Sequence, residues 1–191
     1  MMPRLRLPGA WFGVASFVLA AMLGPASGSA AVFEADVAQD VAVKAAFLFN
    51  FAKFAEWPAL AASAPIVVCI IGDDRIADAF QETVRGQNIS GHTLEVGRPA
   101  DSGAWRTCHL LFLADAEARR SAAAMTAVGM LPVLTVSDSK GFSQAGGIIE
   151  LYVEAGRMRF AINVDAAERS GLRLSSRLLG LAKVIRNAHV Q

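Results

Sequence analysis

Histidine and cysteine, on which most metal sites and many catalytic sites depend, are scarce in this sequence. Its 191 residues include only His92, His109, His189, Cys69 and Cys108. None of them has a second histidine or cysteine at the spacing that zinc sites prefer. Cys108 and His109 are adjacent, but neighbouring residues of a strand point to opposite faces and cannot act as a thiolate and its base. We therefore predict no metal site and no cysteine nucleophile.

The glycine-rich and nucleophile motifs of common enzyme classes are also missing. The sequence contains no GxSxG, no P-loop and no GxGxxG, which mark hydrolases and nucleotide-binding folds. Gly146-Gly147 lies between a loop and a strand, whereas phosphate-binding glycines lie between a strand and a helix. Because no nucleophile–base pair can be named, we predict no catalytic residue and no cofactor. We expect a binding protein rather than an enzyme.

The chain has no excess of charge of either sign. Its formal net charge is +1, and without residues 1–31, which hold Arg4 and Arg6 and no acid, it becomes −1. The basic residues are scattered among acidic ones, whereas a phosphate-binding surface needs clustered positive charge. We therefore expect no nucleic-acid partner.

Residues 1–31 have the pattern of a signal peptide. Two arginines are followed by an uncharged apolar stretch from Ala10 to Leu23, then by Pro25, and small residues surround Ala31. The alternative is a membrane anchor, which needs about 20 continuous apolar residues. We predict cleavage near Ala31 or Val32, export to the periplasm, and a single mature domain over residues 32–191.

The segment 35–55 is predicted to be a helix. It contains no glycine or proline, and Phe47, Phe51 and Phe54 recur at helical spacing. Phe49 lies about 200° around the helix from Phe47, so one contact with a core cannot bury both rings. Such a helix is either deeply buried or shared with a partner. We expect the Phe49 side to contribute to a homodimer.

The rest of the chain alternates between strand and helix patterns. Continuous apolar runs rich in β-branched residues predict strands buried on both faces, and amphipathic segments predict the helices between them. The predicted strands are 66–71, 93–96, 108–114 and 131–136, and the predicted helices are 75–85 and 117–128. This order indicates an α/β fold with a largely parallel sheet and helices on both faces.

The pattern changes in the C-terminal part. Two alternating runs, 148–154 and 157–164, flank Ala155-Gly156 and predict an antiparallel hairpin in which Glu154 faces Arg157. A terminal helix is expected to start at Ser175 or Ser176, with Leu178, Leu181, Ala182 and Ile185 facing inward.

Cys69 and Cys108 are expected to form a disulfide, because an exported chain enters an oxidising compartment. Both fall in or beside predicted core strands that a 2-1-3 strand order would make neighbours. The loop of 39 residues suggests about 4 kcal/mol of stabilisation. The alternative is a pair of buried free thiols.

Polar residues follow two predicted parallel strands. Gly72 and Asp73 come after the first, and Ser137 and Asp138 after the last. Open α/β sheets bind ligands beyond the carboxyl ends of their strands, so these four residues are candidates for a small-ligand crevice. Their other interpretation is turn formation and helix capping.

Several segments together resemble the YfiR family of periplasmic proteins. They span the mature chain in order: KAAFLFNFAKF (44–54) through Trp57-Pro58, CIIG (69–72), CHLLF (108–112), LTVSD (134–138), GGII (146–149), RFAIN (159–163) and SSRLL (175–179). The resemblance implies a parallel-sheet α/β fold, a tendency to dimerise and a regulatory role. It also implies repression of a membrane-bound diguanylate cyclase through that enzyme's periplasmic domain, relieved by an outer-membrane lipoprotein of the YfiB type, and hence control of cyclic-di-GMP and biofilm.

A repressor of this kind acts through protein–protein contact, and the candidate contact residues are Phe49, Lys53, Phe54, Trp57 and Arg159. Each of them also has a structural interpretation, as core packing or as part of a solvated face. Some family members carry a second cysteine pair in the stretch corresponding to residues 138–150, and this chain has none. The resemblance therefore does not extend to redox control through that second bridge. The alternative function is sensing of a small ligand in the crevice near Asp73 and Asp138.

Overall fold

A computed structural model describes residues 28–58, 60–99, 101–115 and 118–186. The predicted cleavage point lies at the edge of this range, and residues 1–27 of the predicted signal peptide lie outside it. Helix α1 (Gly28–Lys53) is continuous through the region of Ala31 and ends close to the position expected from the sequence. Among the described residues, no helix combines the length and apolar character needed to cross a membrane.

The secondary structure follows the predicted alternation in the first two thirds of the chain. After α1 come β1 (Ala55–Glu56), β2 (Ile66–Ile71), α2 (Asp74–Val84), β3 (Asn88–Ile89), β4 (His92–Gly97), the short helix η1 (Ala104–Thr107), β5 (Leu110–Leu113), α3 (Ala118–Val128) and β6 (Leu134–Ser137). The last third contains β7 (Ile149–Glu154), β8 (Arg157–Asn163), α4 (Val164–Arg169), β9 (Arg173–Leu174), α5 (Ser176–Leu179) and β10 (Lys183–Ile185). Strands β1, β3, β9 and β10 were not predicted.

The main sheet has the strand order β10-β8-β7-β6-β5-β2-β4-β3. Neighbours β4, β2, β5, β6 and β7 are parallel, whereas β7 and β8 form the predicted antiparallel hairpin. Glu154 faces Arg157 as expected, and the turn uses Ala155 and Gly156 at positive φ (49° and 71°). The α/β fold with a largely parallel sheet is confirmed.

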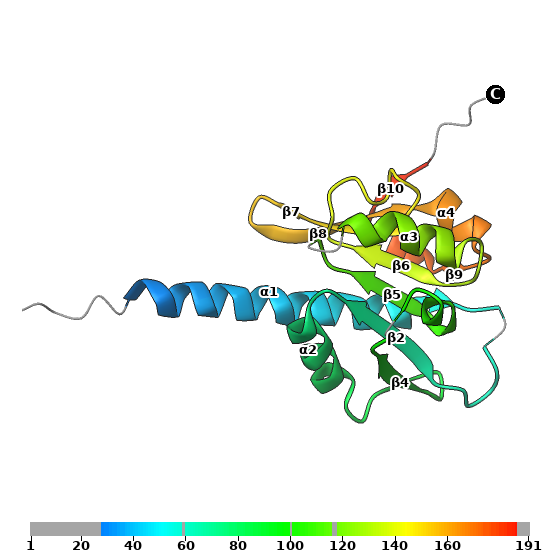
Figure 1. The fold of residues 1–191 in the computed structure, drawn as a ribbon, viewed down its shortest axis with the longest axis horizontal. Helices are drawn as coiled ribbons and strands as arrows, with labels where there is room; N and C mark the ends of the chain where they lie inside the picture. Colours follow the sequence, from blue (N-terminus) through cyan, green and yellow to red (C-terminus); the bar gives the residue numbers. More distant parts are fainter. Residues whose placement is uncertain (1–27, 59, 100, 116–117, 187–191) are drawn as a thin grey trace, which may run out of the picture.

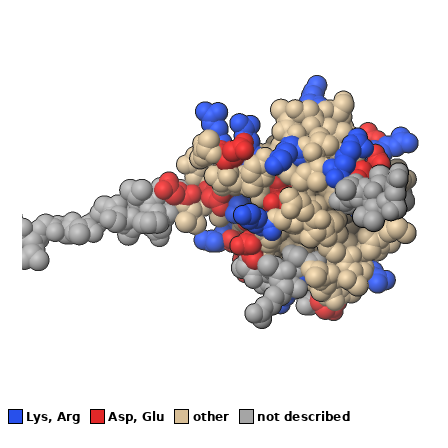
Figure 2. Space-filling model, turned by 90° about the horizontal axis from the view of Figure 1, so that it is seen from above, with Lys and Arg blue, Asp and Glu red and all other residues tan. Residues whose placement is uncertain are grey.

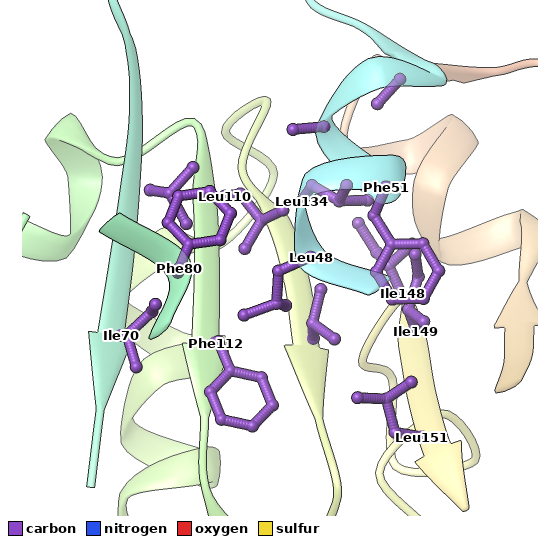
Figure 3. Packing of buried hydrophobic residues seen from close by; sticks show 14 of the residues in the cluster. Leu48, Phe51, Ile70, Phe80, Leu110, Phe112, Leu134, Ile148, Ile149 and Leu151 are labelled. Atoms are coloured by element: carbon purple, nitrogen blue, oxygen red, sulfur yellow. The ribbon is translucent and has the colours of Figure 1, made fainter. Parts of the chain in front are cut away.

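Helices cover both faces of the sheet (Figure 1). One face carries α1 and α2, and Figure 3 shows Leu48 and Phe51 of α1 and Phe80 of α2 pointing into its apolar layer. Each of these side chains is fully buried, which contributes roughly 1.5–3 kcal/mol apiece. The opposite face has a second core beneath α3 and η1, built around Leu111, Leu113 and their neighbours.

The terminal helix is shorter than predicted. Ser175 caps α5, its side chain accepting a hydrogen bond from the Leu178 amide, but the helix ends at Leu179. After Gly180 the chain becomes extended and pairs with β8 as the edge strand β10. Leu181, expected to face inward, is 71% exposed. The β-branched Val184 and Ile185 suit a strand beside the open edge of β8 better than a further helical turn.

Candidate partner-binding site

The candidate contact residues at the end of α1 do not form one cluster. Phe54 is half-buried, and the Lys53 ammonium lies 6.0 Å from the centroid of its ring. Arg159 belongs to β8, where it alternates with the buried Phe160 and therefore points to the opposite face of the sheet. Of the five candidates, only Phe54 lines the apolar hollow described below, and Lys53 lies beside its ring.

Trp57 is held by His109, a residue to which the sequence assigned no role. The indole Nε1 donates a hydrogen bond to the His109 carbonyl at 3.0 Å, and the two rings meet edge to face. The same histidine joins β2 and β5, because its Nδ1 accepts a hydrogen bond from the Val67 amide at 3.0 Å while its own amide donates to the Val67 carbonyl. Burial, with a smaller effect of His92, lowers the pKa of His109, so the neutral ring is the form that accepts this bond. Trp57 therefore helps to hold the start of β5 in place.

Phe49 is covered from within the chain. It is half-buried and packs against the main core, on the margin of α1 opposite to Phe47. The Phe47 ring packs against the rings of Phe51 and Phe160, with 5.7 Å between ring centroids in each case. The sheet and α2 together surround a wide arc of α1, which is how two rings about 200° apart are both accommodated. The expectation that the Phe49 side lacks cover from its own chain is wrong.

An apolar hollow does open beside Phe54. We call it the α1–β8–α5 groove, and its volume is about 220 Å³. Its lining consists of four phenylalanines, two leucines and two polar residues: Phe47, Asn50, Phe51, Phe54, Phe160, Arg177, Leu178 and Leu181. Exposed Leu181 stands at its margin, and the cations Lys53 and Arg177 are also exposed there. The sequence missed this groove because Leu181 was assigned to the inner side of a longer helix.

The ligand-crevice candidates lie at the carboxyl ends of two strands that are not neighbours. Gly72 and Asp73 follow β2, Ser137 is the last residue of β6 and Asp138 follows it, and β5 lies between the two strands. Asp73 caps α2, accepting hydrogen bonds from the Arg75 amide and guanidinium. The Arg75 guanidinium holds the pKa of Asp73 below its usual range.

At β6, the polar groups bond within the chain. The Ser137 hydroxyl donates to the Leu113 carbonyl at 2.7 Å, and Asp138 accepts from the Asp115 amide at 2.6 Å. Lys44 reaches over from α1 and binds both Asp138 and Asp40, at 2.7 and 2.8 Å. Both carboxylate oxygens of Asp138 therefore have partners within the chain. Within the described ranges, no three His, Cys, Asp or Glu side chains are grouped so as to hold a metal ion.

The two cysteines form a disulfide. Cys69 of β2 and Cys108, just before β5, have Cα atoms 5.8 Å apart, and both are buried. The order β4-β2-β5 is the 2-1-3 arrangement that brings them together. Gly97 of β4 lies directly beside Cys69, and a Cβ at this glycine would be only 2.8 Å from the Cys69 sulfur. The neighbouring strand therefore requires a residue without a side chain at this point.

Figure 2 shows one face of the molecule, on which acidic and basic side chains alternate with uncharged areas. Neither positive nor negative charge dominates this face.

Comparison with known proteins gives a structural neighbour and a family. A conserved domain protein from Vibrio cholerae O1 biovar El Tor has a TM-score of 0.45 and 12% sequence identity over 64% of this chain. The match spans 54% of that protein's own length, about half of it. The family DUF4154, described as YfiR/HmsC-like, matches residues 41–183, from the middle of α1 to the start of β10. The chain therefore belongs to the YfiR/HmsC-like family of periplasmic regulators.

Proposed function

We propose that this protein represses a membrane-anchored diguanylate cyclase by binding the enzyme's periplasmic domain through the α1–β8–α5 groove. The observation that carries the proposal is the apolar lining of the groove beside an exposed leucine, Leu181. Concave apolar pockets that receive an anchor side chain are typical centres of protein–protein interfaces. Membership of a regulatory family supports the same conclusion.

The groove also suggests the chemistry of the partner. Phe54 and Phe160 provide an aromatic wall, and Lys53 and Arg177 stand at the rim. A matching partner surface presents one or two apolar side chains flanked by carboxylates. Rim charges of this kind set the association rate and orientation more than the final affinity.

Repression across a membrane requires unequal binding to two states of the partner. A ligand that binds both conformations equally shifts neither. Moving the cyclase from 99% active to 99% inactive needs about a 10⁴-fold preference, or about 5.5 kcal/mol. An interface of about 1,600 Å² with a few anchored apolar side chains can supply this difference.

Two further interactions belong to the proposal. An outer-membrane lipoprotein of the YfiB type would relieve repression by sequestering the protein. Homodimerisation is also proposed, and the exposed Leu181 and Val184 are now better contacts for it than Phe49, which packs inside its own chain.

The test is the level of cyclic-di-GMP in cells with the gene deleted and then restored. Deletion should raise the level, the wild-type gene should lower it, and Leu181→Glu should fail to lower it, because a carboxylate at the groove repels an acidic partner. The matched control is Val153→Glu, since Val153 is 67% exposed but lies on the hairpin outside the groove. Equal repression by both variants would remove the groove from the mechanism.

Unchanged cyclic-di-GMP on deletion, together with no binding of purified protein to any periplasmic sensory domain, would contradict repression altogether. Sensing of a small ligand near Asp73 and Asp138 would then be the better account. In that case a ligand would compete with Lys44 and the Asp115 amide for the Asp138 carboxylate.

A further inference from the structure

Strand β4 is only partly covered on its outer side. In the described part of the chain, β3 pairs with His92 and Thr93 alone, whereas β2 pairs with Leu94 to Gly97 on the other side. The outer edge from Leu94 to Gly97 is therefore open. At about 3.3 Å per residue, this edge is roughly 13 Å long.

Two hydrogen-bonding patterns show which backbone groups face the open edge. The β3–β4 hairpin has a two-residue turn, Ser90-Gly91, with φ values of 53° and 89°. In such a turn the flanking pair, Ile89 and His92, exchanges hydrogen bonds, so alternate residues of β4 point to the same side as His92. By this count, the N–H and C=O groups of Leu94 and Val96 point outward.

The pairing of β4 with β2 leads to the same assignment of outward-facing backbone groups. The Val67 carbonyl accepts a hydrogen bond from His109 of the β5 side, so Val68 directs its own groups toward β4. Val68 is level with Val96, and in a parallel pair it bonds to the residues on either side of that partner, Glu95 and Gly97. Leu94 and Val96 are again the residues left for an additional strand.

A groove of about 750 Å³ runs along this edge, and we call it the α2–β4 groove. It is lined by Gln81 and Val84 of α2, by Arg85 at the end of this helix, and by Leu94 and Val96. Figure 1 shows α2 and β4 close together at one end of the sheet. A strand edge beside a helix is a geometry in which an extended peptide can gain main-chain hydrogen bonds from the edge and side-chain contacts from the helix.

The charges at the groove indicate the occupant. Arg85 and Arg98 belong to its lining, and both are well exposed, at 73% and 55%. They pair with the exposed Glu82 and Asp78, and exposed pairs of this kind are weak and easily exchanged for other carboxylates. Glu95, the only acidic residue of the lining, alternates with Leu94 and Val96 and so points to the other face of the sheet.

One register in which a second copy of the chain could pair with this edge is disfavoured. If Leu94 of one copy is paired antiparallel with Val96 of the other, the two-fold axis falls on Glu95. The two Glu95 side chains are then directly opposite each other, and like charges in this position are destabilising.

We propose that the α2–β4 groove binds an extended, acidic segment of a partner protein by strand addition to Leu94 and Val96, with carboxylates meeting Arg85 and Arg98. The occupant is a strand because the edge offers a row of backbone donors and acceptors. It is acidic because the lining holds two exposed arginines and one acidic residue, Glu95, and because the exposed pairs of these arginines with Glu82 and Asp78 are weak. This site is separate from the α1–β8–α5 groove, so neither proposal depends on the other.

The test uses ¹⁵N-labelled mature protein and two synthetic peptides, acetyl-DVTVTVD-amide and its counterpart acetyl-KVTVTVK-amide. The acidic peptide should slow hydrogen exchange of the Leu94 and Val96 amides at least tenfold. The Glu95 and Gly97 amides, which already bond to β2, should change little. The lysine peptide should have no such effect.

Charge reversal provides the second arm. In Arg85→Glu/Arg98→Glu, affinity for the acidic peptide should fall at least tenfold and the lysine peptide should now protect Leu94 and Val96. Arg157→Glu, at an exposed arginine on the far part of the sheet, is the matched control and should bind like the wild type.

Three outcomes would overturn the proposal. The first is no protection of Leu94 and Val96 at millimolar acidic peptide. The second is unchanged peptide preference after charge reversal. The third is protection that rises with protein concentration alone, which would assign the edge to a second copy.

Discussion

Lys44 of α1 forms an ion pair with Asp138 at the end of β6, with 2.7 Å between Nζ and Oδ2, and both side chains are about 15% exposed. The residues are 94 positions apart in sequence. This pair attaches the long N-terminal helix to the carboxyl edge of the sheet, from which the first half of α1 projects (Figure 1).

Replacing Lys44 by methionine should lower the free energy of unfolding by about 1–3 kcal/mol, because a mostly buried carboxylate loses its charged partner. Asp40→Asn is the control, since Asp40 is 43% exposed and its pair with Lys44 should contribute less than about 1 kcal/mol. Urea unfolding of the three proteins measures both values. Equal stability of the wild type and Lys44→Met would show that the pair does not stabilise the fold.

The same lysine predicts a loss of stability in alkali. Burial lowers its pKa, but the hydrogen bonds and charges of Asp138 and Asp40 outweigh this effect, and the net pKa lies above 10.5. A pKa that is higher in the folded state gives a contribution that is complete below the unfolded value and is lost as the pH rises through the folded one. As the pH rises above 10.5, wild-type stability should fall toward that of Lys44→Met. If the free energies of unfolding of the two proteins fell with pH in parallel, the loss of stability in alkali could not be assigned to Lys44.

His109 predicts a loss of stability in mild acid. Burial, aided by the charge of His92, lowers its pKa below 6.5, so its contribution is complete above that value and is lost as the pH falls through the folded pKa. Protonation also removes the acceptor that the Val67 amide uses. The melting temperature should therefore decrease below pH 6.5 in the wild type, and this decrease should be smaller in His109→Gln. NMR titration showing a normal His109 pKa would refute the explanation.

Reducing the Cys69–Cys108 disulfide should destabilise the fold by about 2–5 kcal/mol. Replacing both cysteines by serine should give a similar loss, and reductant should then have no additional effect. Denaturant unfolding with and without dithiothreitol makes the comparison. A wild-type protein indifferent to reductant would indicate that the bridge contributes little.

Export predicts a mature chain that starts near Ala31 or Val32. Intact-mass measurement of protein from the periplasm checks the position. An uncleaved N-terminus would instead favour the membrane-anchor interpretation of residues 10–23.

Phe49→Glu and Leu181→Glu are expected to have different effects. Phe49→Glu should destabilise the fold, because the ring packs against the core of its own chain. Leu181→Glu should alter the oligomeric state without this loss of stability, because Leu181 is mostly exposed. Size-exclusion chromatography with light scattering, combined with thermal melting, separates the two effects, and a wild-type monomer would end the dimer proposal.

Local pattern was sufficient for most of the fold. The apolar run 66–71, the phenylalanine spacing in α1 and the Ala155-Gly156 turn each depend on neighbours in sequence, and each appears as predicted. The cysteine pairing also followed, because the predicted β-α-β order brings β2 and β5 together. Strands β1, β3, β9 and β10 escaped prediction because they have only two or three residues, too few for a period to be visible.

The sequence by itself determined the parallel α/β core, the hairpin and the disulfide, because periodicity and turn chemistry are local. Only the tertiary structure decided which side chains are available for function. Leu181 became exposed because the chain after Gly180 pairs with β8 instead of continuing α5. Phe49 and Trp57 became structural because α2, the sheet and His109 lie against them. Whether a side chain is exposed depends on elements that lie far away along the chain. A short segment of sequence does not show which of these elements will pack against it.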